Sequence, residues 1–137
     1  MAVKLDLTAE EAYEIADSFA QASARVLDYR IAHRDHLAPA ESDELEKCED
    51  RLDHMVVMFR GYGIQLIGAK ASDAVLELKA AIEIAKAAME QVEKIKDAIK
   101  LASALVELAV ALTSKDPKAI LAAAKALKTS AGAEKEK

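Results

Sequence analysis

Mostly apolar residues recur near the start of the chain at alternating intervals of three and four, which is the spacing of one face of an α-helix. The positions are Ala12, Ile15, Phe19, Ala22, Val26, Tyr29, His33 and His36. Ahead of them, Thr8 and Glu11 have the spacing of a capping box, which satisfies backbone amides at a helix start. Pro39 disfavours helical backbone in the residue before it. The pattern predicts a first helix over residues 9–36.

A second seam with the same spacing follows a short turn. Its positions are Leu45, Cys48, Leu52, Met55, Phe59, Tyr62 and Leu66. This seam predicts a second helix over residues 40–67 that continues through Gly61 and Gly63, with a break at Gly61 as the alternative. Because the turn between the two helices is short, they should form an antiparallel hairpin.

Residues 69–116 contain neither glycine nor proline and consist largely of strong helix formers. This stretch predicts one very long third helix over residues 73–114, with Ser72 as its N-cap. Asp116 followed by Pro117 is a typical helix start. A short fourth helix over residues 117–128 is therefore expected to fold back on the end of the third.

The predicted helices differ in length. Each of the first two would be about 42 Å long, and the third about 63 Å, at 1.5 Å per residue. The first hairpin cannot cover so long a helix. We therefore expect a single domain over residues 1–137 with a three-helix core (1–98), a projecting apolar hairpin (99–128) and a disordered tail (129–137). The alternative is a kink near residues 96–100 that folds the second half back into a compact bundle.

The projecting hairpin would carry more apolar surface than the short fourth helix can cover, because a second apolar seam appears in the last third of the long helix. Exposed apolar patches on proteins usually mark an interface. We expect self-association, or the binding of a protein partner, at Leu101, Leu105, Leu108, Leu112, Ile120, Leu121 and Leu127.

Composition supports an all-α fold, since the chain has 30 alanines but only two prolines and four glycines. The net charge of −5 disfavours a nucleic-acid partner, which needs a basic face. The charge is uneven: residues 1–71 carry −6, whereas residues 72–137 carry +1. The first half is therefore the acidic half.

A cytoplasmic location is the expectation from three features. Cys48 is the only cysteine, so no disulfide forms within the chain. The start of the sequence lacks the apolar run of a signal peptide. The longest apolar stretch is residues 101–113, which Glu107 interrupts, and a membrane span needs roughly 20 residues. We therefore do not expect a membrane partner.

Candidate chemistry is sparse. His33 and His36 lie three residues apart at the tip of the first hairpin, and Glu44 could face them, which makes these three a weak metal site. A solvated helix end explains the histidines better. No catalytic motif, phosphate-binding loop or cofactor-binding motif occurs in the sequence. We expect neither an enzyme nor a bound cofactor.

The sequence thus favours a non-enzymatic helical protein that interacts with other proteins or forms homo-oligomers. Small, acidic helical proteins with a hairpin core are similar in outline to bacterial immunity proteins and antitoxins, which neutralise a toxin by covering it. That similarity of shape and charge implies an alternative, the binding of a different protein through the acidic first hairpin. A second alternative is a membrane-active hairpin formed by residues 101–112 and 120–127.

Overall fold

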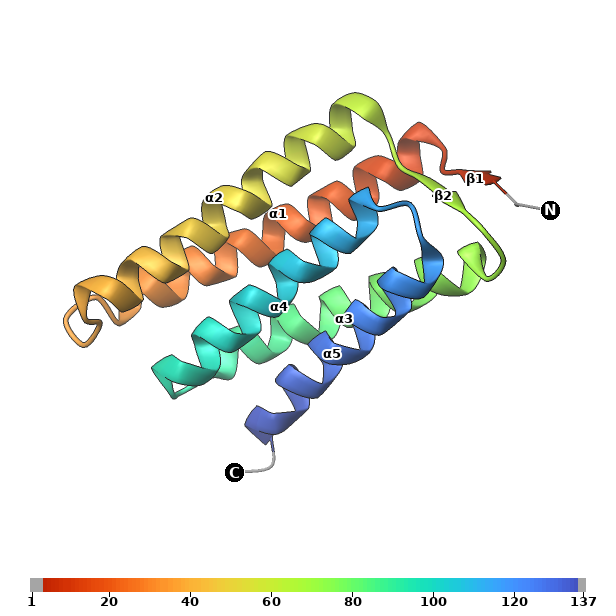
Figure 1. Cartoon of the computed structure of the whole chain (residues 1–137). Coiled ribbons are helices and arrows are strands. Elements are labelled where there is room, and N and C mark those ends of the chain that lie inside the picture. Colours follow the sequence, from red (N-terminus) through yellow and green to blue (C-terminus); the bar gives the residue numbers. More distant parts are fainter. Residues whose placement is uncertain (1–3, 136–137) are drawn as a thin grey trace.

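Five helices and a small two-stranded ribbon make up the part of the chain that the computed structural model describes (Figure 1). It describes the backbone of residues 4–135 and the side chains of residues 7–132. The helices are α1 (Ala9–Ala32), α2 (Pro39–Tyr62), α3 (Ala71–Gln91), α4 (Ile95–Thr113) and α5 (Pro117–Lys135), and the strands are β1 (Lys4–Asp6) and β2 (Gln65–Ile67). The predicted all-α class is confirmed, but five helices replace the predicted four.

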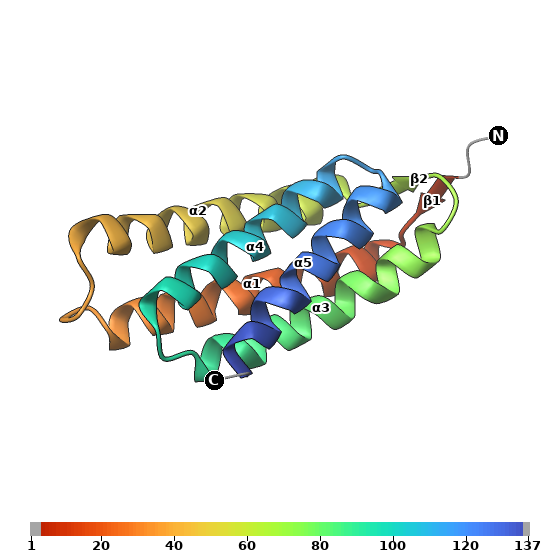
Figure 2. The same ribbon diagram turned by 60° about the horizontal axis from the view of Figure 1, so that its bottom comes forward.

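Each helix runs antiparallel to the one before it in the chain (Figure 1 and Figure 2). α1 packs on α2 and α3, α2 packs on α4, and α5 packs on both α3 and α4. The helices thus close a ring around one hydrophobic core. All five contribute to its largest fully buried side chains, which are Ile15, Phe19, Leu45, Leu52, Leu66, Leu78, Ile82, Leu101, Leu105, Leu108, Ile120 and Leu127.

The start of α1 follows the sequence prediction and its end does not. The Glu11 amide donates to Thr8 Oγ1 at 3.1 Å, and the Thr8 amide donates to Glu11 Oε1 at 3.2 Å, which is the predicted capping box. The helix ends at Ala32, four residues early, and residues 33–36 form a turn. This turn is needed because α2 begins at Pro39, whose ring fits the first position of a helix.

The prediction that the second helix runs through both glycines to residue 67 is wrong. α2 passes through Gly61 but ends at Tyr62, because Gly63 takes φ +78° and ψ −170°, a conformation open essentially to glycine alone. Beyond it, β2 pairs antiparallel with β1, with Leu66 opposite Leu5. Leu66 therefore reaches the core from a strand and not from a helix.

The ribbon formed by the two strands fastens one end of the bundle. The Leu7 amide donates to the Ile64 carbonyl at 3.0 Å, and the Ile67 amide donates to the Lys115 carbonyl at 2.8 Å. The second bond joins the α2–α3 connection to the α4–α5 turn. Three segments that are distant in sequence are thereby held side by side (Figure 1).

The predicted single helix over residues 73–114 is divided at residues 92–94. Val92 and Lys94 take extended conformations, with ψ of 134° and 130°, and Lys70, two residues before the predicted Ser72, is the N-cap of α3. No glycine or proline causes this break. Folding back lets the wide apolar face of α4 reach the core, and burial outweighs helix propensity of well under 1 kcal/mol per residue. The alternative of a kink near residues 96–100 is closer to the structure, although the observed break lies slightly earlier in the chain.

The predictions of a projecting hairpin and of a short last helix are also wrong. α4 and α5 lie within the bundle, and α5 continues to Lys135 because Ala131 is fully buried against the core. Residues 129–135 are therefore helical, while residues 136–137 of the predicted tail lie outside the described chain. The start of α5 is as predicted, since Asp116 Oδ1 accepts from the Lys118 amide at 3.0 Å. The division into a core of residues 1–98 and a projection does not hold.

No helix in the described part of the chain is both long enough and apolar enough to cross a membrane.

Candidate functional site

The residues predicted as an interface lie inside the bundle. Leu101, Leu105, Leu108, Leu112, Ile120 and Leu127 are all buried within the chain, and Leu121 is half-buried beside a hollow of about 360 Å³ at the start of α5. The apolar surplus that motivated the prediction disappears once α4 folds back. A contact at the six buried side chains would require α4 or α5 to leave the core, and only Leu121 of the predicted set is partly exposed.

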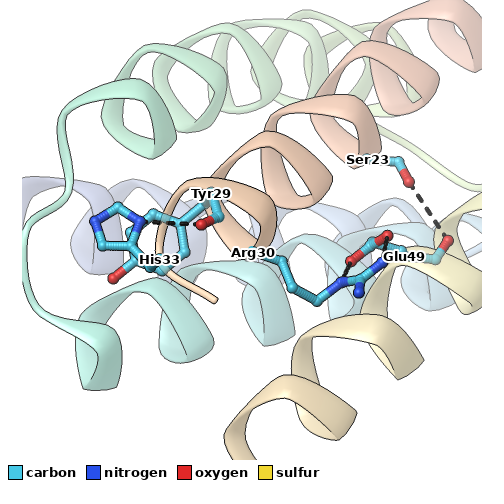
Figure 3. A network of polar contacts seen from close by, with 5 residues as sticks. All are labelled: Ser23, Tyr29, Arg30, His33 and Glu49. Atoms are coloured by element: carbon cyan, nitrogen blue, oxygen red, sulfur yellow. Dashed lines mark hydrogen bonds and ion pairs between the residues drawn. The ribbon is translucent and has the colours of Figure 1, made fainter. Parts of the chain in front are cut away.

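The weak metal candidates are not brought together. His33 caps α1 half-buried, stacked on Tyr29 with ring centroids 3.9 Å apart, and its Nδ1 lies 3.0 Å from the Tyr29 carbonyl oxygen (Figure 3). His36 is exposed in the turn, and Glu44 is exposed on α2. Among the described residues, no three His, Cys, Asp or Glu side chains are grouped closely enough to hold a metal ion.

Cys48 is a core residue beside a small hollow between α2 and α4. Its Sγ lies 3.9 Å from Ser103 Oγ, and the hollow of about 210 Å³ is also lined by Glu44, Arg51 and Glu107. Burial raises the pKa of the Cys48 thiol, an effect that the Ser103 hydrogen bond opposes. The thiol is therefore held protonated, which is the reverse of what a cysteine nucleophile needs.

The α1–α2 hairpin is held together by a cluster of polar contacts between its two helices (Figure 3). Arg30 Nε donates to Glu49 Oε2 at 2.6 Å and Arg30 Nη2 donates to Oε1 at 3.0 Å, while Ser23 Oγ donates to the Glu49 carbonyl at 3.4 Å. The bond to Glu49 raises the pKa of Arg30, despite desolvation that lowers it, and nearby Glu46 and Asp50 add to the rise. This cluster fixes the register in which the two helices pack.

That register places an apolar stripe on the outer face of the hairpin. On α1, Tyr13, Leu27 and Ile31 are 50%, 36% and 53% exposed, and Val57 on α2 is 68% exposed. At 100° per residue, the three α1 positions share one side of the helix, which points away from the buried seam of Ile15, Phe19 and Val26. α2 and α3 are the helices that pack most closely on α1, so no helix of the described chain covers this outer face.

The α2 edge of the same face is acidic. Glu46, Asp50 and Asp53 are exposed and recur at the spacing of one helical face. None of them forms an ion pair within the residues that the structure describes, whereas Asp17 on α1 is paired with Arg60. The hairpin as a whole, residues 9–62, has 13 acidic and six basic residues, a net charge of −7 with the histidines neutral. We call Tyr13, Leu27, Ile31, Val57 and this acidic edge the outer face.

Sequence reasoning identified the acidic first half but missed this stripe. The signal was present in α1 as a second seam at intervals of four and three, formed by Ala20, Ala24, Leu27 and Ile31. It was hidden because only the inward seam, through Phe19 and Val26, has large apolar residues at nearly every turn. The position of Val57 relative to this seam depends on how α2 packs on α1, which the sequence of one helix alone does not reveal.

The most exposed large apolar side chain of the described residues stands at the ribbon end of the bundle. Tyr62 is 89% exposed at the last position of α2, between hollows of about 180 Å³ and 400 Å³ that both include Gly63, Ile64 and Lys115. These hollows hold no group of side chains suited to acid–base or nucleophilic chemistry. The outer face has more exposed large apolar side chains than this end of the bundle.

Comparison of the chain with protein-family models, with curated proteins and with solved structures finds no match.

Proposed function

We propose that this chain is a non-enzymatic protein that acts by binding another protein through the outer face of its α1–α2 hairpin. The observation that carries the proposal is the coincidence on one uncovered surface of four exposed large apolar residues and an acidic edge without ion-pair partners in the described chain. Apolar side chains grouped on a surface usually mark an interaction site. This is the partner-binding alternative that the charge of the first half suggested.

The chemistry of the outer face specifies the partner class. Exposed side chains such as Ile31 and Val57 favour a partner with an apolar surface. The acidic residues along α2 favour a partner with lysines or arginines beside that surface. An amphipathic helix with one apolar side and one basic side has this arrangement. Such a helix can lie along the surface formed by α1 and α2. Charge attraction would accelerate encounter and weaken as salt rises.

The other two functional hypotheses would require a different structure. Self-association through Leu101 and Leu105 requires those buried side chains to become exposed. A membrane-active α4–α5 hairpin likewise requires the bundle to open, because its apolar sides face the core. Docking on the outer face needs no rearrangement, and we therefore favour it.

The experiment uses a fluorescent helical peptide of about 20 residues with leucines along one side and lysines flanking them. We expect this peptide to bind the wild-type protein. A version of the peptide with glutamate in place of each lysine should not bind. The triple variant Leu27→Gln, Ile31→Gln, Val57→Gln should weaken binding at least about tenfold, since that corresponds to only 1.4 kcal/mol.

A matched control is available on α3. Leu76 is 68% exposed, as Val57 is, but lies outside the acidic hairpin, so Leu76→Gln should leave the affinity unchanged. Circular dichroism would verify that all variants stay folded. Equal loss of binding in the Leu76 variant, or equal binding of the two peptides, would contradict the proposal.

A further inference from the structure

The solvent-exposed side of α5 is basic, whereas the outer face is acidic. Lys118, Ala122, Lys125, Ala126 and Thr129 are exposed along it, and residues 117–132 contain no acidic residue. Lys128 is turned toward α3 and pairs with Glu77 at 2.5 Å. Lys118 and Lys125 make no ion pair with any residue that the structure describes. This helix therefore presents two unpaired cations on an alanine surface.

The charges on the two surfaces have the same spacing. Lys118 and Lys125 are seven residues apart on α5, and Glu46 and Asp53 are seven residues apart on α2. Seven residues of α-helix make two turns, or about 10.5 Å, so both separations are the same. A helix carrying these lysines can therefore meet both carboxylates at once.

The apolar parts of the two surfaces also fit. α5 has 19 residues and is about 28 Å long, and the stripe from Tyr13 to Ile31 covers about 27 Å at the same rise per residue. Alanines such as Ala122 and Ala126 allow another helix to approach closely, whereas Leu27, Ile31 and Val57 supply larger side chains to pack on them.

We propose that the occupant of the outer face is α5 of a second copy of this chain, with Lys118 and Lys125 against the acidic edge of α2. This inference rests on the proposed function, because it names the partner of the same surface. The two surfaces are different and lie on different sides of the bundle (Figure 1 and Figure 2). The contact is therefore heterologous: each copy offers both surfaces, and copies add head to tail into a ring or an open chain.

The test measures the mass of the full chain by sedimentation and light scattering. The wild-type protein should grow in mass with concentration at about 50 mM salt and dissociate at about 500 mM, because the Debye length shortens several-fold. Glu46→Lys with Asp53→Lys should raise the dissociation constant at least tenfold. Lys118→Glu with Lys125→Glu should do the same.

Mixing separates docking from damage to the fold. In each charge-reversed variant, the α2 edge and α5 carry the same sign of charge, so copies of one variant repel each other. In an equimolar mixture, the α2 edge of each variant can meet an α5 of opposite charge on the other variant, so association should return. One chain carrying all four reversals should also associate. The control Glu44→Lys with Glu107→Lys makes the same charge change on exposed residues outside the outer face, and it should not disperse the assembly.

Three results would overturn the inference: a wild-type monomer up to about 1 mM protein at low salt, no recovery in the mixture, or a closed dimer unaffected by reversal of Lys118 and Lys125. If the wild type is monomeric but binds the lysine peptide through Ile31 and Val57, the proposed function stands and only the identity of the partner falls. If the peptide does not bind, the proposed function itself falls.

Discussion

Arg30 on α1 and Glu49 on α2 are joined by two hydrogen bonds, of 2.6 and 3.0 Å, with the Glu49 residue only 7% exposed. Both ends of the guanidinium fork are used, which fixes the relative position of the two helices as well as their distance. The outer face depends on this register, because a shift of α2 would move Val57 and the acidic edge relative to Ile31.

Removing one member of this pair should destabilise the protein strongly. We expect Glu49→Ala to lower the free energy of unfolding by about 2–3 kcal/mol, because it leaves Arg30 without its partner in a partly buried place. Urea denaturation would measure the change. Asp17→Asn, which breaks the exposed pair with Arg60, serves as the control and should cost less than about 1 kcal/mol. Equal losses in the two variants would show that the Arg30 pair has no special role.

Leu105 should behave as a core residue and not as an interface residue. It is fully buried, so Leu105→Ala should lower the free energy of unfolding by about 3–4 kcal/mol through lost burial and the cavity left behind. Leu121→Ala should lower the free energy of unfolding clearly less, because Leu121 is only half-buried. Thermal unfolding followed by circular dichroism would compare them. A Leu105→Ala protein of unchanged stability but lower oligomeric mass would restore the original interface prediction.

The break between α3 and α4 can be tested at Lys94. This residue is the N-cap of α4 and makes no side-chain capping bond. Lys94→Ser should therefore be more stable than Lys94→Ala by about 0.5–1 kcal/mol, because serine can cap the exposed amides and alanine cannot. In an unbroken helix the serine variant would be the less stable one, since serine has the lower helix propensity. The sign of the difference between their urea midpoints decides between the two, with Lys96→Ser inside α4 as the destabilising reference.

The two glycines near the end of α2 should respond in opposite directions. Gly61 lies within the helix with open space around its position, so Gly61→Ala should stabilise by about 0.5–1 kcal/mol. Gly63→Ala should destabilise by about 1–3 kcal/mol, since alanine is strained at φ +78°. Melting temperatures of the two single variants are sufficient. Stabilisation by both would mean that the helix runs on through Gly63.

Cys48 should ionise at higher pH in the folded protein than a free thiol, because burial raises its pKa. A folded-state pKa above the unfolded value means that the thiol stabilises the fold fully below about pH 8.5, and that this contribution declines as pH rises further. The rate of labelling by a thiol reagent between pH 7 and 10 should have a midpoint above that of the protein in denaturant. Coincident midpoints would indicate an exposed thiol.

Local chemistry explains why some features followed from the sequence. The capping box at Thr8 and Glu11 and the Asp116–Pro117 helix start need only residues a few positions apart, and both are present. The inward seams of α1 and α2 were also correct for most positions, from Ile15 to Phe59, because a helix of fixed period must turn such residues to one side. The failures are the ends of helices and the number of helices.

By itself, the sequence determined the all-α class, the first hairpin and the acidic character of its surface, since helix propensity, periodicity and charge are properties of short segments. Only the tertiary structure decided that residues 92–94 leave the helix, that Leu66 enters the core from a strand, and that Leu101 and Leu105 are internal. Each of those outcomes depends on how much apolar surface distant segments can bury together. That burial outweighs the small propensity of a glycine-free and proline-free stretch to remain one helix.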